Sequence, residues 1–441
     1  MILQHTPGRL LLFIVDCCVL FVALYTALLI RTGEAFTLGE FLAYIPPFTL
    51  VILVSVSIFY SYGLYDKPSL RLIRELSNRI FTSQILTALS AVLLFYTLPV
   101  LGIAPKTILF IYIALSSLLM IIWRKYAFSL VLRYKKHNSV LIGSGETYHL
   151  LIDELSRNPH TGITLIATID VDSYPMDTIG KALVNTKPNS IIIDMKDERI
   201  KPHLGALYSE FFSGCAVLDI IDVYEDVFDM VPTSLINQEW VFRCISTSRR
   251  YDGVKRFFDV LLAIPSGILS LTVFPFIYLA IKLEDGGPIF YTHKRIGRYG
   301  KSFDVYKFRS MENLPTNEKH EIKQVTKVGL FLRKTRLDEL PQLWNVIKGD
   351  VSLVGPRPEA PSLVDEYIKT VPFYNVRHVV RPGLSGWAQI QQHIAPKFGV
   401  DVKQTEIKLA YDLYYLEHSS FILDFAIILK TFKVLLSKSG Q

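Results

Sequence analysis

Cysteine is scarce in this sequence, and the few cysteines do not form a disulfide pattern. The 441 residues include four cysteines. Cys17 and Cys18 are adjacent in an apolar segment, whereas Cys215 and Cys244 each stand alone. Secreted folds that depend on disulfides carry many cysteines at short, regular spacings. The sequence therefore predicts reduced thiols in a protein that faces the cytosol.

Acidic residues are outnumbered as well. The chain has 40 acidic and 47 basic residues, which gives a formal net charge of +7. A basic excess suits anionic lipid head groups or phosphorylated substrates, and does not by itself indicate a nucleic-acid partner. Charged residues make up only 20% of the chain and hydrophobic residues 50%, which is high for a soluble protein. We expect membrane segments, membrane lipids as partners and no nucleic acid.

A cleavable signal peptide is also missing, because the first apolar run is too long and no small-x-small site follows it. That run covers residues 10–30, and three more follow at 41–60, 80–101 and 104–123. Each is close to the ~20 residues that a helix needs to span a bilayer. We predict a four-helix transmembrane bundle over residues 1–130.

The charges between these runs predict how the bundle is oriented. Basic residues gather after the second and fourth runs (Lys67, Arg71, Arg74, Arg79, Arg124, Lys125, Arg133, Lys135 and Lys136), and the other two loops offer Arg31 and Lys106. The positive-inside rule then places both ends of the bundle in the cytoplasm, as in a multi-pass protein of the inner (cytoplasmic) membrane. Asp16 lies inside the first run, where a charge is costly. A helix–helix contact is favoured for it over a proton relay.

Residues 138–248 predict a Rossmann-like α/β domain. Residues 139–145 have the pattern of a strand and a glycine turn and 146–158 that of a helix, while 164–170, 189–195 and 214–221 read as further strands. Gly143 and Gly145 resemble a dinucleotide fingerprint, but Tyr148 replaces its third glycine, and Asp170 is the candidate for the ribose-binding acid. A bound dinucleotide stays open. Spacing, oligomerisation or regulation is the favoured role.

A fifth apolar stretch covers residues 254–283. Lys255 and Arg256 precede it, and Lys282 and a further basic cluster follow it, so both ends are expected in the cytoplasm. Pro265 and Pro275 offer points at which a helix would break. The sequence therefore predicts a re-entrant membrane helix, which enters the bilayer and returns on the same side.

Two segments nearer the C-terminus also read as membrane-associated. Residues 293–309 are basic with interleaved aromatics, and beside a membrane helix they fit a membrane surface better than a nucleic-acid patch. Residues 421–438 are apolar with spaced lysines, Lys430, Lys433 and Lys438. They predict an interfacial amphipathic helix or a core helix, and both interpretations stay open.

The most informative stretch is LFLRKTRLDELPQLWNVIKGDVSLVGPRP at residues 330–358. It places two adjacent carboxylates, Asp338 and Glu339, close to Arg333 and Arg336. Proline is tolerated in the first turn of a helix, so Pro341 predicts a helix that begins near Asp338. The helix dipole would favour ionised carboxylates there and would attract phosphate. For the pair alone an ordinary helix cap is the favoured explanation, and the longer run shifts the balance toward a phosphate site.

That run and four others resemble the bacterial polyprenyl-phosphate hexose-1-phosphate transferases, also called monotopic phosphoglycosyltransferases. The other matching blocks are KRFFDVLLAI (255–264), GGPIFYTHKRIGRYGKSFDVYKFRSM (286–311), RPGLSGWAQI (381–390) and YDLYY (411–415). The larger members of this family carry a similar middle domain between bundle and catalytic part. The resemblance implies a re-entrant helix at 254–283 and a mostly α catalytic domain at 284–441. One departure is Phe274-Pro275, where the family has Ser-Pro.

The resemblance also implies a reaction. A sugar-1-phosphate would pass from a UDP-sugar to polyprenyl (undecaprenyl) phosphate through a phospho-aspartate, with release of UMP and ping-pong kinetics. Asp338 would be the nucleophile, Glu339 would hold metal or manage a proton, and both would bind Mg²⁺. The substrate-binding set that the resemblance suggests is Arg333, Arg336, Arg357, Pro356, Pro358, Lys307 and Arg309. The product would begin exopolysaccharide, capsule or O-antigen synthesis.

Two other classes of protein compete with this transferase. A membrane-anchored nucleotide-sugar dehydratase or epimerase should carry a full glycine fingerprint and a Tyr-x-x-x-Lys pair. A non-enzymatic assembly or regulatory protein has no need of a carboxylate pair among arginines. The sugar stays open because Gln391, Gln392 and His393 replace the Asn-Gly-Arg-like continuation of many relatives. The oligomeric state is open too, with a homodimer as one option.

Overall fold

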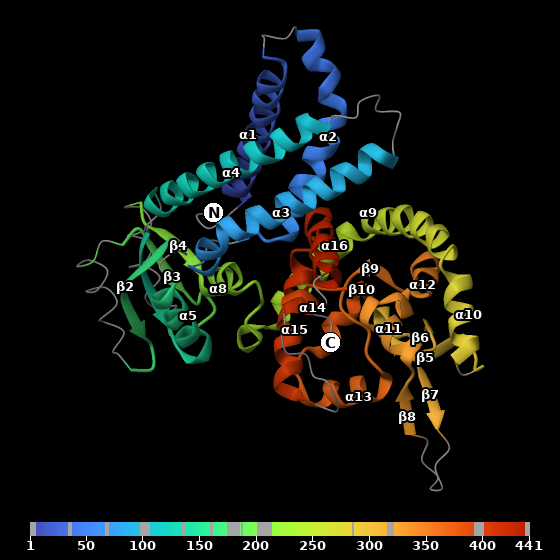
Figure 1. Cartoon of the computed structure of the whole chain (residues 1–441). Coiled ribbons are helices and arrows are strands. Elements are labelled where there is room, and N and C mark those ends of the chain that lie inside the picture. The colour runs from blue at the N-terminus through green and yellow to red at the C-terminus, as the bar shows by residue number, and fades with distance from the viewer. Residues whose placement is uncertain are drawn as a thin grey trace. The chain divides into compact units, whose positions relative to one another are not determined.

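The computed structural model divides into two units, Met1–Phe228 and Asp229–Gln441, which are treated separately here (Figure 1). The structure describes residues 6–33, 38–66, 70–97, 106–134, 137–158, 162–173, 186, 188–200, 214–284, 286–314, 322–391 and 401–436. Lys67, Lys135, Lys136, Gln392, His393 and Lys438, on which some of the sequence interpretation depends, lie outside these residues.

The first unit begins with four long helices, α1 (Thr6–Thr32), α2 (Leu38–Ser61), α3 (Leu70–Thr97) and α4 (Lys106–Tyr134). Each contains a segment long and apolar enough to cross a membrane. Helices satisfy their own backbone hydrogen bonds, which is what a chain in hydrocarbon requires. The four predicted transmembrane helices are therefore confirmed, and the protein is membrane-anchored.

Asp16 holds two of these helices together. Its carboxylate is fully buried, forms an ion pair with Arg124 of α4, and accepts hydrogen bonds from Tyr65 Oη at 2.7 Å and Trp123 Nε1 at 3.1 Å. Arg124 also donates to the carbonyl of Leu64 at 2.9 Å. The predicted helix–helix contact of Asp16 is confirmed.

A parallel sheet follows in the order β2-β1-β3-β4, built from β1 (His137–Gly143), β2 (Ile163–Asp170), β3 (Ser190–Ile193) and β4 (Ala216–Asp219). Helices α5 (Gly145–Arg157) and α8 (Ile220–Phe228) belong to the same α/β domain. The predicted strands, glycine turn and helix are present. Strands with such continuous apolar runs must be buried on both faces of the sheet, as is usual in parallel sheets.

The fingerprint-like turn of this domain is filled by protein. Tyr148 is buried, and its ring lies 3.3 Å from where a Cβ on Gly143 would be. The carboxylate of Asp170 accepts hydrogen bonds from the backbone of Asp172 and the hydroxyl of Ser173. These contacts explain why tyrosine stands at the third glycine position. They give no support to a dinucleotide site.

The second unit contains helices, short strands and 3-10 turns. In chain order they are η4 (Thr233–Leu235), α9 (Gln238–Leu271), α10 (Phe274–Glu284), β5 (Phe290–Ile296), η5 (Arg298–Gly300), β6 (Ser302–Phe308), β7 (Met311–Leu314), β8 (Ile322–Val325), α11 (Lys327–Thr335), η6 (Leu337–Glu339), α12 (Gln342–Lys348), β9 (Ser352–Val354), α13 (Pro361–Thr370), η7 (Tyr374–Val379), β10 (Gly383–Ser385), α14 (Trp387–Gln391), α15 (Val402–Glu417) and α16 (Phe421–Leu436). β5 and β6 form one antiparallel hairpin, and β7 and β8 another (Figure 1).

The core of this unit reaches further toward the N-terminus than the predicted catalytic domain. Val231, Trp240 and Cys244, which the sequence places in the α/β domain, pack in one cluster with Leu413 and Ile427. The last of these residues lies on α16, the predicted interfacial or core helix. One face of α16 is therefore core, while Ile422 on the same helix is 76% exposed.

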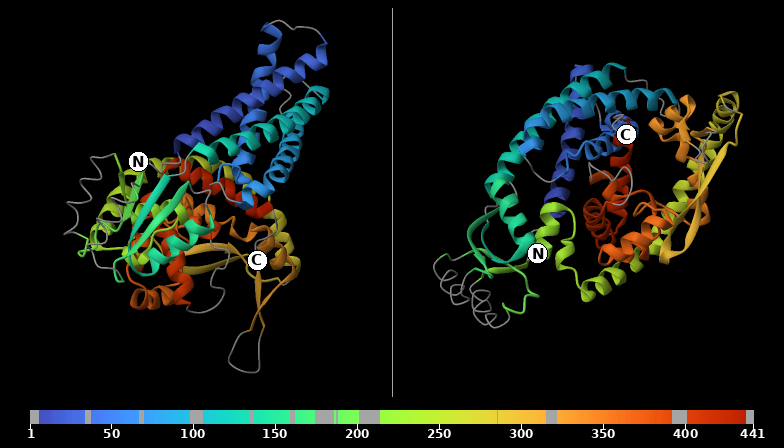
Figure 2. Two further views of the ribbon diagram at one scale, coloured as in Figure 1. Left: turned by 90° about the vertical axis from the view of Figure 1, so that its left-hand side faces the viewer. Right: turned by 90° about the horizontal axis from the view of Figure 1, so that it is seen from below.

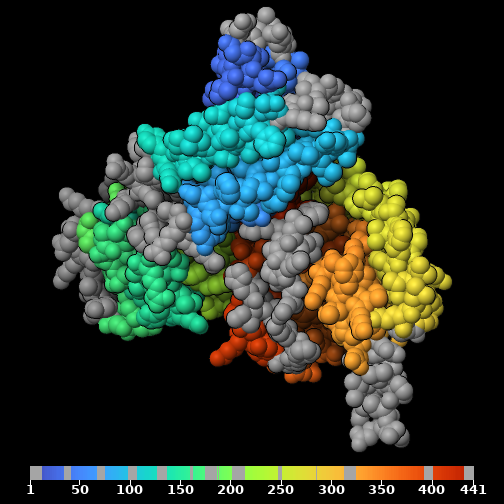
Figure 3. All heavy atoms as spheres, in the orientation of Figure 1, coloured from blue at the N-terminus to red at the C-terminus, as the bar shows by residue number. Residues whose placement is uncertain are grey.

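Helices α9 and α10 meet at a bend of 51° and run along one side of the unit (Figures 2 and 3). The bend falls at residues 272–273, directly before Phe274-Pro275. Pro265 lies inside α9 and does not break it, so that predicted break point was wrong. Pro275 lies in the first turn of α10, where proline is tolerated, so the single break falls directly before it.

The Asp16–Arg124 pair gives a test of the bundle. Asp16→Leu or Arg124→Leu alone should destabilise the protein by ~3–5 kcal/mol, because each leaves an uncompensated buried charge. The double variant should lose less unfolding free energy than the sum of the losses in the two single variants. A double-mutant cycle from thermal unfolding in detergent checks this, and simple additivity would contradict it.

Candidate active site

The two adjacent carboxylates lie in a 3-10 turn, η6, between α11 and α12. The α-helix begins at Gln342, with Pro341 at its N-cap position. The predicted helix start near Asp338 was therefore wrong. Arg336 precedes the turn in the left-handed conformation, with φ 57°, and this reverses the chain after α11. The acid pair thus sits in a tight reversal, one turn before the helix.

Glu339 is held by three cations. Lys307 Nζ lies 2.8 Å and Arg357 Nη2 3.4 Å from its Oε1, and Arg336 Nη1 lies 3.6 Å from its Oε2. Burial by itself would raise the pKa of Glu339, but Arg357 and Lys307 outweigh it and lower that pKa to about 2. These three predicted substrate-binding residues are brought together around Glu339. Side-chain cations keep this carboxylate charged.

Asp338 behaves differently from its neighbour. It is 7% exposed, and its Oδ1 is buried without a hydrogen-bond partner. Burial raises the pKa of Asp338, Glu339 adds to the rise, and Lys307 opposes it. We expected the helix N-terminus to favour the ionised form of Asp338, which would lower its pKa. That expectation was wrong, because the pKa is raised. The structure presents one carboxylate held by cations beside one whose Oδ1 is buried without a hydrogen-bond partner.

The other predicted residues are less close to the acid pair. Arg333 is exposed at the end of α11, and its charge acts on Asp338. Arg309 donates to the carbonyl of Met311 at 3.0 Å and lies against Gly287, where a Cβ would be 1.3 Å from its Nη1. Pro356 is buried and Pro358 half-buried. Arg333 is the residue of this group whose charge is seen to act on Asp338.

Close backbone packing fixes the Pro-Arg-Pro turn. Gly355 N donates to Ser385 O at 2.8 Å, and Gly383 N donates to Pro356 O at 2.9 Å. A Cβ on Gly383 would lie 2.1 Å from Gly355 N, which no structure tolerates. Glycine is therefore required where β9 and β10 pass each other. This explains part of the RPGLSGW block and holds Arg357 on the Glu339 side.

A buried network supports the same turn from behind. Arg377 donates to Arg357 O at 3.0 Å, to Asp412 Oδ2 at 3.0 Å and to Tyr374 Oη at 2.8 Å. Burial would raise the pKa of Glu359, but Arg377 and Lys408 outweigh it and lower that pKa to about 2. Sequence reasoning missed this network. The one feature of the sequence that could have indicated it is Asp412 in the YDLYY block.

The charged residues of KRFFD, at residues 255–259, fasten α9 to the site. Arg256 donates to Val346 O at 2.5 Å and to Ile347 O at 2.7 Å, at the end of α12. Asp259 Oδ1 accepts from Ser352 Oγ and Leu353 N, each at 3.0 Å. Lys255 Nζ lies 2.6 Å from Asp424 Oδ2. The sequence suggested membrane-flanking charges here, whereas these side chains bind protein.

Two cavities lie next to the acid pair. A cleft of about 570 Å³ runs between α12 and the end of α9, and is almost entirely apolar; it is lined by Ile264, Gly267, Ile268, Ser270, Leu271, Phe274, Phe290, Tyr306, Leu340, Pro341, Leu343, Trp344 and Ile347. A smaller pocket of about 240 Å³ has Lys334, Arg336 and Glu339 on one side and Ser385, Gln389 and Thr431 on the other. Leu340 and Leu343 line both cavities. The two spaces therefore share a wall of two leucines.

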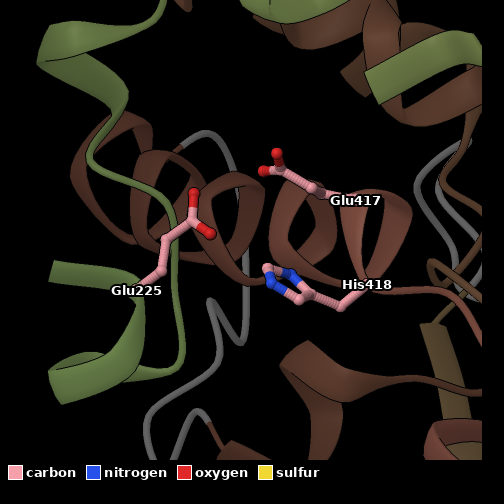
Figure 4. Close-up of side chains that lie close together, drawn as sticks. All are labelled: Glu225, Glu417 and His418. Carbon is pink, nitrogen blue, oxygen red and sulfur yellow. The ribbon is translucent and has the colours of Figure 1, made fainter. Parts of the chain in front are cut away.

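Glu417 and His418 end α15 and are shown in Figure 4. Glu417 accepts a hydrogen bond from Arg243 at 3.2 Å, and the His418 ring stacks on Tyr414 with centroids 4.3 Å apart. The third side chain drawn, Glu225, belongs to the other unit. We assign no ligand to these residues.

Comparison with known proteins gives two family matches. The model described as bacterial sugar transferase matches residues 250–438, and one described as CoA-binding domain matches residues 60–207. The UDP-N-acetylgalactosamine-undecaprenyl-phosphate N-acetylgalactosaminephosphotransferase of Aeromonas hydrophila is 35% identical over 268 residues, 57% of this chain and 60% of that protein. The UDP-glucose:undecaprenyl-phosphate glucose-1-phosphate transferase of Klebsiella pneumoniae is 31% identical over 330 residues, 70% of each chain. The chain spans about half the length of several curated relatives that it matches.

The opposite environments of the acid pair predict opposite effects on stability. Because the pKa of Asp338 is raised on folding, its charge opposes folding above the pKa of the unfolded chain. The pKa of Glu339 is lowered, so its charge favours folding above the unfolded value and this contribution is lost as pH falls toward about 2. In chelator near neutral pH, Asp338→Asn should unfold at a higher temperature than the wild type and Glu339→Gln at a lower one. Thermal unfolding checks this, and shifts of the same sign would contradict it.

Proposed function

The chain belongs to the bacterial sugar transferase family, and from this we propose that it transfers a sugar-1-phosphate from a UDP-sugar to polyprenyl phosphate and releases UMP. The observation that carries the proposal is the buried, unpartnered Oδ1 of Asp338 beside a carboxylate held by Lys307, Arg336 and Arg357. A buried carboxylate oxygen without a partner is a costly feature. Its cost is explained if that oxygen is the one that reacts.

The proposed reaction has two steps. Asp338 Oδ1 attacks the phosphorus that bears the sugar, the bond from that phosphorus to the bridging oxygen breaks, and UMP leaves with the electron pair. An oxygen of the lipid phosphate then attacks the same phosphorus, and the Asp338 carboxylate is released. Lys307, Arg336 and Arg357 offset charge on the phosphoryl oxygens, which is the main task of a phosphoryl-transfer site. Arg357 of the Pro-Arg-Pro turn seats the nucleotide.

Mg²⁺ is part of the proposal. The donors at hand are the carboxylate oxygens of the acid pair, the hard ligands that Mg²⁺ prefers. Asp338 and Glu339 would hold the ion, which when bound would supply positive charge to the phosphate oxygens.

The membrane setting follows from the helices. We propose an inner-membrane protein whose catalytic unit faces the cytoplasm, where nucleotide sugars are made, with α9 and α10 as a re-entrant helix. The 51° bend beside Pro275 supports this. The relatives are named as transferases for N-acetylgalactosamine, glucose and galactose. The proposed sugar is therefore a hexose or an N-acetylated hexose. The lipid-linked product would initiate a surface polysaccharide.

The reaction predicts a burst without lipid acceptor. Purified enzyme freed of polyprenyl phosphate and given a panel of radiolabelled UDP-sugars should release UMP in an amount equal to the enzyme, and the trapped label should lie on Asp338. Asp338→Asn should abolish the burst because an amide cannot accept the phosphoryl group. EDTA should suppress it and Mg²⁺ restore it. Label on another residue would refute the assignment of the nucleophile.

The re-entrant helix predicts labelling from one side. Tyr251→Cys and Tyr299→Cys, each in a background without native cysteines, should react with an impermeant thiol reagent from the cytoplasmic face. A membrane span would place these two positions on opposite faces. A cysteine at Lys67 serves as the cytoplasmic reference. Opposite-side labelling of positions 251 and 299 would exclude the re-entrant arrangement.

A further inference from the structure

The apolar cleft between α9 and α12 has no role in the chemistry described above. We propose that it holds the isoprenoid chain of the lipid acceptor, and that its far end limits how much of that chain is bound. The inference rests on the proposed function, since it assigns a place to one of the two substrates. Its volume of about 570 Å³ is typical of a site for a small organic ligand.

The lining of the cleft selects an apolar occupant. Its lining includes the aromatic rings of Tyr306 and Trp344, each with a single polar group, and Ser270, whose hydroxyl already donates to Gly267 O at 2.7 Å. The rim residues Leu271 and Trp344 are 59% and 61% exposed. Large exposed apolar side chains around a cleft mark a ligand or membrane contact. A branched hydrocarbon chain matches this surface, and a nucleotide does not.

The neighbouring pocket selects an occupant with an anionic head. Leu340 and Leu343 separate the cleft from the pocket that contains Lys334 and Arg336. One molecule that passes over these two leucines would place its apolar chain in the cleft and its charged end beside the cations. Glu339 also lines that pocket, so the head group would arrive next to the acid pair. A polyprenyl phosphate has this distribution of charge and hydrocarbon.

The packing of α9 and α10 shows which end of the cleft is near the acid pair and which end is far from it. Phe274 and Leu340, which directly follows the acid pair, pack against the same core cluster and both line the cleft. Ala263 packs against Val346, at the other end of α12. Ile264, next to Ala263, therefore marks the end of the cleft far from the acids. A bulky side chain there should shorten the cleft and leave the head-group end unchanged.

The test compares Ile264→Trp with Leu262→Trp in the full chain in lipid nanodiscs. The two positions are 43% and 44% exposed, but only Ile264 lines the cleft. Each variant is given a series of prenyl phosphates of increasing length, from geranyl to undecaprenyl phosphate. The wild type and Leu262→Trp should use longer acceptors with increasing kcat/KM. Ile264→Trp should lose this increase and use undecaprenyl phosphate about tenfold less well, because isoprene carbons that no longer fit lose their burial.

The UMP burst separates this inference from the proposed function. All three proteins should show the same burst without acceptor, because the cleft does not touch the donor. No burst in the wild type would overturn the proposed function. A normal burst with the same chain-length dependence in Ile264→Trp as in the wild type would overturn the inference alone, and so would a wild-type rate independent of length. In either case the cleft would hold acyl chains of the bilayer only.

Discussion

The guanidinium of Arg256 donates hydrogen bonds from both terminal nitrogens to backbone carbonyls at the end of α12. Because α12 directly follows the acid pair, this contact helps to set the position of the two carboxylates. The last carbonyls of a helix lack partners within it, and a cation is favoured there by the helix dipole. Gly349 follows in the left-handed conformation with φ 98° and turns the chain away. The planar guanidinium of arginine presents two separate nitrogens in a rigid fork, and here each nitrogen serves one carbonyl. The helix that follows Asp338 is thereby fixed to α9.

The two carboxylates show how neighbours in sequence acquire different chemistry. Glu339 meets three cations, whereas Oδ1 of Asp338 is buried without a hydrogen-bond partner. Burial acts on both, and the balance with nearby charge decides the sign of each pKa shift. The backing network of Arg377 and Asp412 serves the stabilised side, because it holds the carbonyl of Arg357. Charge stabilisation and reactivity are therefore assigned to separate residues.

Much of this arrangement could be predicted from the sequence, since it depends on patterns along the chain. Long apolar runs predicted the four helices, and short apolar runs before turns predicted the parallel strands. The cluster of acids and arginines indicated a phosphate site, and Lys307, Arg336 and Arg357 meet there. The start of α12 was missed because Pro341 is compatible with a cap as well as with a first turn. The inward role of Arg256 was missed because a cation beside an apolar run looks the same whether it meets lipid or carbonyls.

The continuity of α9 has a mechanical consequence. This helix of 34 residues is about 51 Å long at ~1.5 Å per residue, and it runs without a break from Trp240 in the core to the bend at residues 272–273. A rod of this kind transmits displacement from one end to the other. In the proposed re-entrant arrangement the bend lies in hydrocarbon, so a displacement of the bend would be carried along α9 and through Arg256 to α12. Movement of this helix in the bilayer and the position of the acid pair would then be mechanically coupled.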